Sequence, residues 1–397
     1  MRVVVHDHSG HPFQVQLSRS LAKIGHDVLH VFNASFQSPR GILIKKSNDP
    51  PNFDIKPIIM PSPFKKYSYL KRQRQEIKYG KIFIKLLKEF NPKIIISANT
   101  PIDSQSIIQK YSIKNGINFI FWVQDLYSLA ISRIIGKKSP FLGKIIAWIY
   151  EHREQSLLRK SDKIVLITED FIPIMKKWKV HSDKIHVIEN WAPLDDIPLM
   201  PKTNPWSEMT ELADKDCFLY SGTLGKKHNP ELILELARHF SRFPKVRIVV
   251  ISEGIGADYL KEYKENLKLD NLILYGYQPF EKMPEVLASA SVLLAQLESD
   301  AGVYSVPSKV LSYLCVGRPL LLAVPVENLV ARIVMENKTG IVVPPNNKTE
   351  FINAAKLLLE DSSLRKKLGS NARRYAEGHF NIKLISQKFN NLIMNCQ

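Results

Sequence analysis

Short apolar runs alternate with longer amphipathic stretches along the chain. Near the amino end, residues 2–6 predict a strand, residues 13–24 carry apolar side chains at helical spacing, and residues 27–32 predict a second strand. Gly25 ends the helix between them. A strand, a helix and a second strand in this order are typical of a β-α-β unit, in which the crossover connects two parallel strands.

The same alternation continues to the carboxyl end. Further strands are predicted at residues 93–97, 119–123, 163–167, 218–222, 246–252, 272–275, 292–294 and 320–323, and a helix is predicted at residues 230–240. Continuous apolar runs bounded by polar residues are typical of parallel strands buried on both faces. The proline-rich stretch 191–216 predicts a linker. We therefore expect an α/β protein with two tandem doubly wound domains, residues 1–195 and 196–378, that face each other across a cleft.

Composition narrows the class of protein. A length of 397 residues, with 45% apolar and 24% charged residues, is ordinary for a soluble globular protein of more than one domain and excludes a disordered or fibrous chain. The cysteines, Cys217, Cys315 and Cys396, are far apart and lack zinc-site spacing, which indicates reduced thiols in the cytosol. No apolar run is long enough to predict a signal peptide or a membrane-spanning helix.

Positive charge is concentrated in the first half of the chain. Residues 1–195 hold 31 basic and 16 acidic residues, a net charge of +15, and the remaining 25 basic and 22 acidic residues leave +3 of the total of +18. The first half is therefore expected to meet an anionic partner: a membrane surface, a nucleic acid or a phosphorylated substrate. Residues 65–81 interleave cations with aromatic and apolar side chains such as Tyr79, which favours a membrane-surface segment, although a solvated helix face has the same pattern.

A glycine turn follows the strand predicted at residues 218–222. Gly222-Thr223-Leu224-Gly225 precedes two lysines, Lys226 and Lys227, and then the predicted helix. Glycine lets the backbone approach a ligand closely, and the N-terminus of the next helix favours an anion. The pattern fits a phosphate site, but an ordinary surface turn has the same composition, and the spacing is not that of a P-loop.

A second candidate lies at a predicted helix start. Ser308 is expected to cap this helix, and Lys309 in its first turn opposes the helix dipole unless an anion binds there. The preceding loop, residues 297–303, holds the carboxylates Glu298 and Asp300, which suit sugar hydroxyls. The alternative for the loop is a solvated connection.

Polar residues also follow two strands of the first half. His6-Asp7-His8-Ser9-Gly10-His11 begins at the end of the first strand, and Gln124 and Asp125 follow the strand at residues 119–123. Ligands of open α/β sheets bind at the carboxyl ends of strands. A metal site is disfavoured because His6, Asp7 and His8 alternate sides when extended, so a polar substrate loop is the better interpretation. Asp125 is a candidate base or hydroxyl ligand, or alternatively a helix cap.

Taken in order, several motifs resemble those of retaining, GT-B-type glycosyltransferases of family four, and in particular the bacterial enzymes of colanic-acid and exopolysaccharide biosynthesis. The segments that carry the resemblance are residues 9–13, 22–28, 161–165, 184–190, 220–222, 252–254, 274–277, 317–319 and 339–344. The resemblance spans nearly the whole chain. It implies two Rossmann-like domains, the first for the acceptor and the second for the nucleotide sugar, with a helix in residues 379–397 that crosses back to the first domain.

The resemblance also implies roles for individual residues. Lys227 and Lys309 would face the donor diphosphate and, together with Asp125, are the candidate catalytic residues. The other candidate donor-binding residues are Gly10, Gly222, Thr223, Glu253, Gly254, Tyr277, Glu298, Asp300, Ala301, Gly302, Val303 and Ser308, and the candidate acceptor-binding residues are His8, Ser9, His11 and Gln124. No metal and no other cofactor is expected, because lysines and helix N-termini can stabilise the leaving diphosphate.

The chain departs from the family pattern at several positions. Thr223 stands where many members have arginine, and His228 stands where they have lysine. The glutamates of the family's Glu-x7-Glu pattern fall at Tyr304 and Ser312, and the histidine before the aspartate is Gln124. These departures leave the nucleotide unnamed.

We therefore expect a metal-independent, retaining glycosyltransferase of the hexosyltransferase class that moves a sugar from a nucleotide-diphosphate sugar to a lipid-diphosphate-linked or saccharide acceptor. Its setting would be exopolysaccharide or lipopolysaccharide biosynthesis, as a cytoplasmic protein held peripherally on the inner face of the cell membrane by its basic half. The alternatives are a nucleotide-sugar epimerase of the same fold, which would act without an acceptor, and a nucleic-acid-binding protein, whose affinity would fall steeply with salt. The basic segments lack a nucleic-acid motif, so no nucleic-acid partner is expected.

Overall fold

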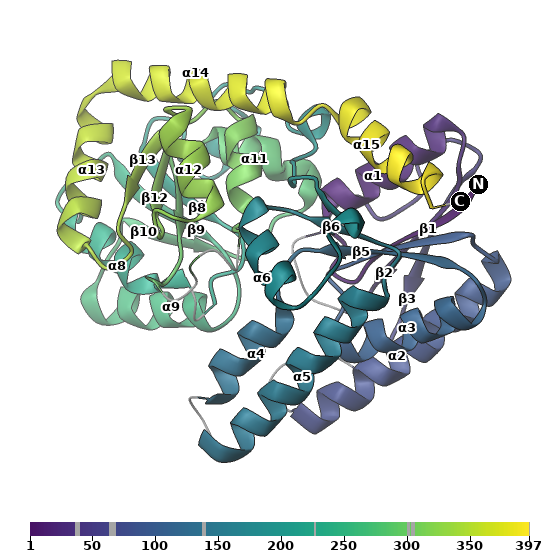
Figure 1. Ribbon diagram of the computed structural model, residues 1–397. Coiled ribbons are helices and arrows are strands. Elements are labelled where there is room, and N and C mark those ends of the chain that lie inside the picture. The colour runs from purple at the N-terminus through teal and green to yellow at the C-terminus, as the bar shows by residue number, and fades with distance from the viewer. Residues whose placement is uncertain are drawn as a thin grey trace. The chain divides into compact units, whose positions relative to one another are not determined.

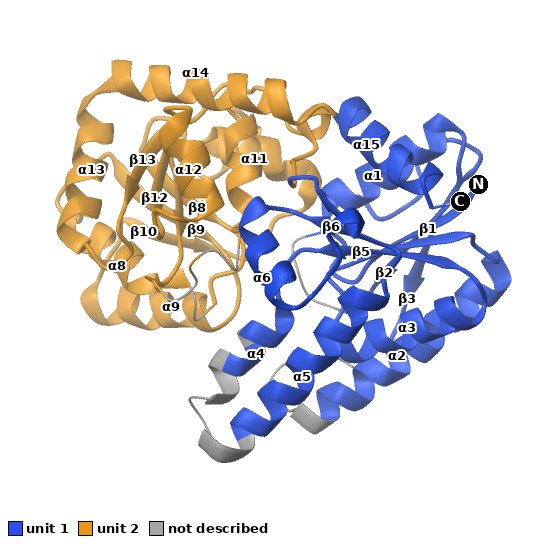
Figure 2. Ribbon diagram, in the orientation of Figure 1, with its two compact units in different colours: residues 1–189, 382–397 blue, residues 190–381 orange. Residues whose placement is uncertain are grey.

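The computed structural model describes residues 1–35, 40–62, 69–136, 140–225, 228–299, 302 and 306–396. The side chains of residues 69, 70, 130, 133–136 and 140–142 are outside this description. The chain divides into two compact units (Figure 2): unit 1 comprises residues 1–189 and 382–397, and unit 2 comprises residues 190–381. The sequence analysis predicted that the first domain ends at residue 195 and the second at residue 378.

Unit 1 is built on a seven-stranded parallel sheet. In spatial order its strands are β3 (Phe53–Ile58), β2 (Asp27–Asn33), β1 (Arg2–Asp7), β4 (Ile94–Ala98), β5 (Asn118–Val123), β6 (Lys163–Leu166) and β7 (Ile185–Val187). In the register of the sheet, Val4 of β1 pairs with Leu29 on one side and with Ile95 on the other. The central strands are apolar and buried almost throughout, as a parallel sheet with both faces covered requires.

Helices cover both faces of this sheet (Figure 1). The helices of unit 1 are α1 (Pro12–Ile24), α2 (Tyr69–Phe90), α3 (Ile102–Lys114), α4 (Tyr127–Gly136), α5 (Pro140–Lys160), α6 (Ile172–Lys177) and α15 (Ile382–Met394). Helices α1 and α15 pack together on one face, whereas α2, α3 and α5 lie on the other. Phe389 of α15 packs on Trp122 of β5, with ring centroids 4.8 Å apart, so the last helix completes the core of unit 1.

Unit 2 is built on a six-stranded parallel sheet. In spatial order its strands are β10 (Leu272–Tyr275), β9 (Val246–Ile251), β8 (Asp216–Ser221), β11 (Val292–Gln296), β12 (Leu320–Ala323) and β13 (Gly340–Val343). Its helices are α7 (Pro205–Met209), α8 (Pro230–His239), α9 (Ile255–Leu267), α10 (Met283–Ala288), α11 (Lys309–Cys315), α12 (Leu329–Glu336), α13 (Lys348–Glu360) and α14 (Ser362–His379). A core that includes Phe218, Phe240 and Phe351, all fully buried, joins the sheet to its helices.

Both sheets reverse their strand order once. The reversal lies between β1 and β4 in unit 1, and between β8 and β11 in unit 2. Every pairing in both sheets is parallel. The prediction of two doubly wound α/β domains is therefore confirmed.

The proline-rich stretch is not a free linker. Trp191 and Trp206 are buried, and the Asn204 side chain accepts the N–H groups of Trp206 and Ser207 at the start of α7 while donating to the carbonyl of Glu285 (3.1 Å). The prediction of a linker at residues 191–216 is wrong, because this stretch belongs to unit 2, where Trp206 packs on Tyr275 and buries apolar surface. Proline at the first position of α7 starts a helix here and does not mark an open connection.

Helix α2 differs from its sequence-based interpretation on one face. Tyr79, expected among the aromatic residues of a membrane-surface segment, is fully buried, together with Phe83, against the sheet. The interpretation is wrong for this residue because the inner face of α2 supplies core side chains, and only its outer face is exposed. Within the described part of the chain, no helix has the length and apolar character that crossing a bilayer requires.

Candidate functional site

The reversals of strand order define where each unit offers a site. Loops that follow the strands on either side of a reversal turn in opposite directions, and this leaves a crevice at the carboxyl ends of those strands. In unit 1 these loops follow β1 and β4, and in unit 2 they follow β8 and β11. The sequence-predicted segments that begin at residues 6, 222 and 297 lie at three of these four strand ends.

In unit 2, the turn after β8 is fixed by a tyrosine from a distant helix. Gly222 has a φ of 125°, a conformation that favours glycine. The hydroxyl of Tyr313 on α11 accepts the N–H of Ser221 (2.8 Å) and donates to the carbonyl of the same residue (2.9 Å). Both backbone groups at the end of β8 are thereby satisfied within the unit, and the turn is held in place.

The remainder of this turn is tied to β9 and α9. The N–H of Leu224 donates to Ser252 Oγ (3.0 Å), and the Leu224 carbonyl accepts the N–H of Gly256 (3.0 Å). The N–H of Gly225 donates to His228 Nδ1 (2.9 Å). His228 is buried, so the residue that replaces the family's lysine has a structural partner in the turn.

Lys309 reaches back from α11 over the same turn. Its ammonium lies 3.6 Å from the centroid of the Tyr220 ring and donates to the Tyr220 hydroxyl and to the Thr223 carbonyl (3.3 Å). A Cβ atom on Gly222 would lie 3.1 Å from Lys309 Cε, so the lysine stem needs the open space over the glycine. The structure thus brings together Gly222, Thr223 and Lys309, which the sequence analysis had singled out separately.

Tyr277 and Glu253 border the turn. The hydroxyls of Tyr277 and Thr223 are 3.1 Å apart, and the N–H of Tyr277 donates to Glu253 Oε1 (3.3 Å). Gly254 follows with a φ of 93° and is the N-cap residue of α9. Burial raises the pKa of Tyr277, so its hydroxyl stays neutral and can donate or accept a hydrogen bond.

The loop after β11 and the start of α11 fit the expectations less closely. Glu298 is half-buried after β11, and Gly302 accepts a hydrogen bond from Asn328 Nδ2 (2.6 Å). Ser308 makes no capping hydrogen bond, and its backbone is already helical, so the prediction that it caps the helix is wrong. The predicted residues Lys227, Asp300, Ala301 and Val303 lie outside the described residues.

In unit 1, Asp7 organises the loop after β1. Its buried carboxylate accepts the N–H groups of Ser9 (2.9 Å) and His11 and the amide of Asn99 (3.3 Å), and His11 Nδ1 lies 3.6 Å away. Burial alone would raise the pKa of Asp7, but these hydrogen bonds and nearby histidines outweigh it and lower the pKa. Asn99 follows β4, so this carboxylate joins the two loops at the reversal and holds the partly exposed His11 ring beside Gly10.

His6 and His8 belong to the core. His6 hydrogen-bonds with Ser97 Oγ (2.9 Å) and Tyr79 (2.8 Å), and His8 hydrogen-bonds with Asn33 (3.0 Å). Burial lowers the pKa of His8 to about 3 and the pKa of His6 well below its ordinary value, so both rings are neutral. Of the predicted acceptor residues in this loop, Ser9 and His11 are therefore partly exposed and His8 is not.

Asp125 is half-buried after β5, and Gln124 beside it is buried. A carboxylate from α5, Glu154, accepts the N–H groups of Tyr127 (3.0 Å) and Ser128 (2.9 Å) at the start of α4. The helix cap is therefore Glu154, which leaves Asp125 available at the carboxyl end of β5. Burial raises the pKa of Glu154 to about 7.

Family comparisons match both halves of this arrangement. Residues 13–196 match the family described as glycosyltransferase family 4, and residues 206–375 match the family described as glycosyl transferases group 1. Together the two matches span nearly all of both units. The chain belongs to these glycosyltransferase families.

Two curated relatives of this glycosyltransferase are distant in sequence. An uncharacterized glycosyltransferase of Methanocaldococcus jannaschii, MJ1069, is 23% identical over 64% of this chain and 63% of its own length. A putative colanic acid biosynthesis glycosyl transferase of Escherichia coli, WcaI, is 21% identical over 70% of this chain and 68% of its own length. The chain thus spans slightly less than two thirds of the archaeal relative.

Among solved structures, the Anabaena protein HepE in complex with UDP and glucose has a TM-score of 0.72 to this glycosyltransferase. The two are 13% identical, with 99% of each chain covered. At this identity the likeness shows the fold, and it extends over both units. The expected GT-B architecture of two parallel-sheet α/β domains is confirmed.

Three partners in the glycosyltransferase site carried no separate prediction in the sequence. Tyr220 and Ser252 appeared only as members of predicted strands and of family motifs, and Tyr313 only as an apolar member of the predicted helix that begins at Ser308. Each acts through one polar atom that points into the turn. A tyrosine at a core position of the sequence pattern indicates a polar contact, because a buried hydroxyl needs a hydrogen-bond partner. This reasoning could have singled out Tyr220 and Tyr313.

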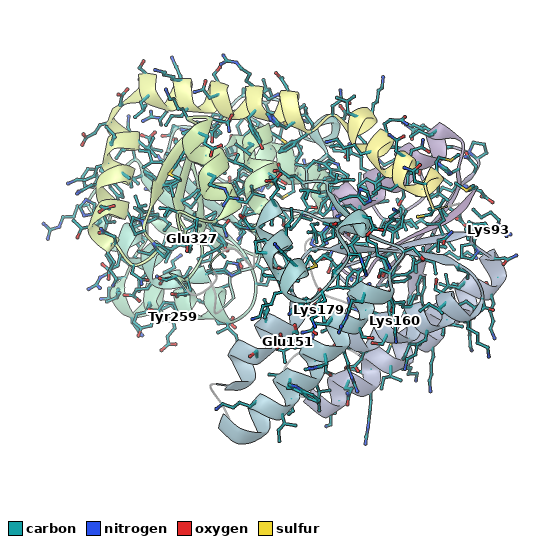
Figure 3. The ribbon with its side chains drawn as sticks, in the orientation of Figure 1. Lys93, Glu151, Lys160, Lys179, Tyr259 and Glu327 are labelled. Carbon is teal, nitrogen blue, oxygen red and sulfur yellow. The ribbon has the colours of Figure 1, made fainter. Side chains whose placement is uncertain are left out.

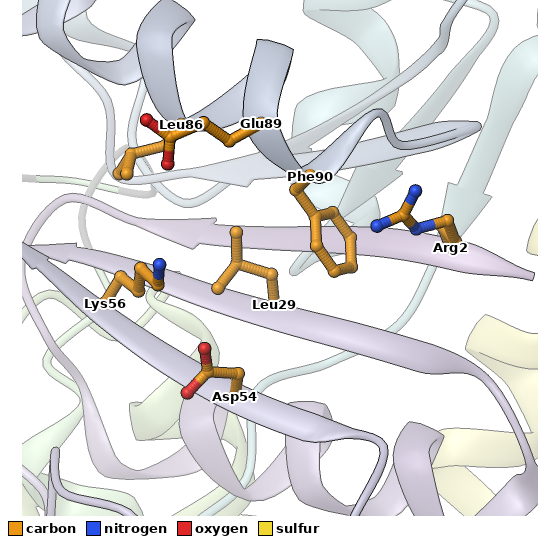
Figure 4. A pocket seen from close by; sticks show the side chains of 7 residues that line it. All are labelled: Arg2, Leu29, Asp54, Lys56, Leu86, Glu89 and Phe90. Carbon is orange, nitrogen blue, oxygen red and sulfur yellow. The ribbon is translucent and has the colours of Figure 1, made fainter.

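A hollow of about 120 Å³ lies elsewhere in unit 1 (Figure 4). It is lined by Arg2, Leu29, Asp54, Lys56, Leu86, Glu89 and Phe90. None of these is a candidate residue, and Arg2 is engaged with the Phe90 ring (4.7 Å) and with Asp27 (3.4 Å). Among the described residues, no group of three His, Cys, Asp or Glu side chains is placed to hold a metal ion.

Proposed function

We propose that this glycosyltransferase moves a hexose, with retention at the anomeric carbon, from a nucleotide-diphosphate sugar to a lipid-diphosphate-linked or saccharide acceptor in surface polysaccharide biosynthesis. The relative of the colanic-acid type supports the setting. The UDP and glucose of the HepE complex support a uridine nucleotide as the first donor to test.

One observation carries the donor half of the proposal. The Lys309 ammonium lies over the Gly222 turn, on the group 1 half of the chain, at the carboxyl end of β8 beside the reversal of strand order. A diphosphate bound on this turn would lie within reach of a fixed cation. The glycosyl bond breaks as the diphosphate gains charge, and a preorganised cation stabilises that charge without a metal ion.

The acceptor half of the proposal rests on Ser9 and His11 in the loop after β1 and on Asp125 after β5. Asp7 fixes the backbone of the first loop, and Glu154 fixes the start of α4, two residues after Asp125. Ser9, His11 and Asp125 are all partly exposed at strand ends of unit 1. We infer that they orient the acceptor hydroxyl. In a retaining transfer the leaving diphosphate itself can take the hydroxyl proton, so a side-chain base is not required.

We further propose that unit 1 rests on the inner face of the cell membrane. Six cations occupy the exposed outer face of α2 at spacings of three and four residues, and we name them the basic stripe: Lys71, Arg74, Lys78, Lys81, Lys85 and Lys88. The stripe extends over about 26 Å of helix. Apolar Ile113 and Trp148 are exposed on α3 and α5, the helices that lie with α2 on one face of the sheet. Further lysines such as Lys93 and Lys160 lie at the surface of this unit (Figure 3).

The test is metal-free calorimetry, in the presence of a chelator, with UDP, GDP, dTDP, CMP and ADP. We expect one diphosphate to bind selectively, with UDP the first candidate, and Lys309→Ala to weaken it about 10- to 100-fold, since hydrogen bonds to charged groups contribute about 1.5–3 kcal/mol. Lys282→Ala is the matched control because it also removes an exposed lysine of unit 2, one that pairs with Glu285 (3.0 Å). It should leave the affinity unchanged.

Two results would contradict the proposal: no binding by any of the nucleotides, or equal binding by wild type and Lys309→Ala. Retention is checked by the anomeric configuration of the product in NMR spectra. Donor turnover without any acceptor would instead favour an epimerase, because a transferase needs an acceptor to release its sugar.

A further inference from the structure

The Lys309 ammonium lies against the phenol of Tyr220. Three contacts of this ammonium lie around the end of β8: the Tyr220 ring face, the Tyr220 hydroxyl and the Thr223 carbonyl. A lysine side chain has four rotatable bonds, so contacts at its end decide where the charge lies. Two of these three contacts belong to Tyr220.

The Tyr220 hydroxyl is itself oriented. It donates to the Thr223 carbonyl (2.7 Å), so its lone pairs remain to accept from the ammonium. The ring is fully buried, and burial raises its pKa well above the ordinary value, so the phenol stays protonated and keeps this polarity. Tyr220, Thr223 and Lys309 therefore form a closed triangle of hydrogen bonds in which each donor has a fixed direction.

The triangle of Tyr220, Thr223 and Lys309 packs against Gly222. Lys309 Cε would lie 3.1 Å from a Cβ of Gly222, and its ammonium nitrogen 3.3 Å. The turn beneath is fixed independently, because Tyr313 binds both backbone groups of Ser221. Tyr220 therefore contacts the ammonium of Lys309, whereas Tyr313 holds the backbone of the turn.

We propose that Tyr220 is a positioning residue for the donor diphosphate: its ring and hydroxyl place the Lys309 ammonium over the Gly222 turn before the nucleotide binds. This inference rests on the proposed function, because it takes the diphosphate as the ligand of Lys309. Pre-positioning removes the conformational-entropy cost of ordering a lysine side chain on binding. The cation–π contact adds attraction that Phe would retain.

The experiment compares the affinities of UDP and uridine, by metal-free calorimetry with uridine measured by displacement, in wild type, Tyr220→Phe, Lys309→Met and the double variant. We expect Tyr220→Phe to weaken UDP about 5- to 10-fold, since a hydrogen bond is worth about 1 kcal/mol, and to leave uridine unchanged. In the double variant UDP should bind as it does to Lys309→Met alone, because the phenol acts only through the lysine.

Tyr313→Phe is the matched control. It removes a buried hydroxyl from the same turn, but this hydroxyl contacts the Ser221 backbone and not Lys309. It is expected to lower the melting temperature and to shift UDP and uridine alike, so their ratio of affinities stays that of wild type. The uridine affinity also reports whether each variant is folded.

The inference is overturned if Tyr220→Phe binds UDP as wild type does, if it weakens UDP and uridine equally, or if its effect adds in full to that of Lys309→Met. Each of these leaves the proposed donor site standing, because wild type still binds UDP. If the wild-type protein does not bind UDP, the assignment of UDP to this site is wrong. The inference about Tyr220 is then overturned as well.

Discussion

At the scale of single residues, two buried carboxylates of unit 1 have pKa values shifted in opposite directions. Asp7 accepts three N–H donors and lies near two histidines, and its pKa falls. Glu154 also accepts hydrogen bonds, from the start of α4, but burial dominates and the Asp125 charge adds to it, so its pKa rises to about 7. Each carboxylate accepts three hydrogen bonds, so the sign of the neighbouring charge, histidines at Asp7 and a carboxylate at Glu154, distinguishes the one that stays ionised.

The shift at Glu154 predicts a pH-dependent stability. Its ordinary pKa of 4.5 applies to the unfolded chain, and about 7 to the folded chain. The folded state therefore holds a proton that the unfolded state releases, and the contribution to the free energy of unfolding is present at low pH and lost as the pH rises through 7. In denaturant titrations, wild type should lose about 2–3 kcal/mol relative to Glu154→Gln between pH 5 and pH 8.

Ser128→Ala is the companion variant for this prediction. The Ser128 hydroxyl donates to Glu154 and stabilises the ionised form, so its removal should move the midpoint of the pH dependence upward. A difference between wild type and Glu154→Gln that stays constant from pH 5 to pH 8 would show that Glu154 does not titrate in this range.

The sequence predicted some of these residues and not their partners. Gly222 and Lys309 stood out because each departs from ordinary local chemistry, a glycine after a strand and a cation at a helix start. Tyr220, Tyr313 and Glu154 did not stand out, because each fits the apolar or amphipathic pattern of its own element. Their role lies in contacts between elements distant in sequence, which local pattern does not encode.

At the scale of elements, the strands that the sequence analysis missed are β3, β7 and β13. All three are sheet edges. An edge strand pairs on one side only, so it can be short and partly polar: β7 has three residues, and β3 contains Pro57, which cannot donate to a ladder. The strands found from sequence are mostly central, where burial on both faces demands a continuous apolar run.

The contact between α9 and the Gly222 turn predicts the effect of a single methyl group. A Cβ on Gly256 would lie 2.4 Å from the Leu224 carbonyl oxygen, too close without backbone movement. Gly256→Ala should therefore destabilise unit 2 by about 1–3 kcal/mol, as overpacking does, and should weaken nucleotide binding because Leu224 belongs to the turn. Thermal unfolding and calorimetry measure the two effects.

Gly378→Ala is the control for this substitution. Gly378 also lies in a helix, α14, but nothing is within 4 Å of its added Cβ. Alanine there should stabilise the helix by about 0.5–1 kcal/mol. Equal melting temperatures for Gly256→Ala and Gly378→Ala would mean that α9 yields to the methyl group without disturbing the turn.

At the scale of the whole molecule, the two halves of the chain differ in net charge. Most of the excess of +18 belongs to the first half, and the basic stripe concentrates six cations on one helix face. At physiological salt, screening limits the electrostatic attraction of these cations to about 8 Å. They therefore act on an anionic layer that the helix touches. An extended row of cations therefore suits a flat anionic layer.

This arrangement predicts binding to anionic vesicles. Lys78→Glu combined with Lys85→Glu should reduce co-sedimentation with phosphatidylglycerol vesicles by at least about 30-fold, because each lysine near an anionic surface contributes about 1 kcal/mol. Lys366→Glu with Lys367→Glu, an equal charge change on the exposed face of α14, should have little effect. Equal loss in both double variants would point to net charge and not to the basic stripe.

The helix α15 closes a unit that begins at the other end of the chain. Residues 1–189 leave the ribosome first, but α15 follows only after residues 190–381 have been made. At 5–20 residues per second this takes roughly ten to forty seconds. For that time the face of Trp122 that Phe389 will cover stays open, whereas unit 2 needs no later segment to fold. The half of the protein that is synthesised first is thus the last to be finished.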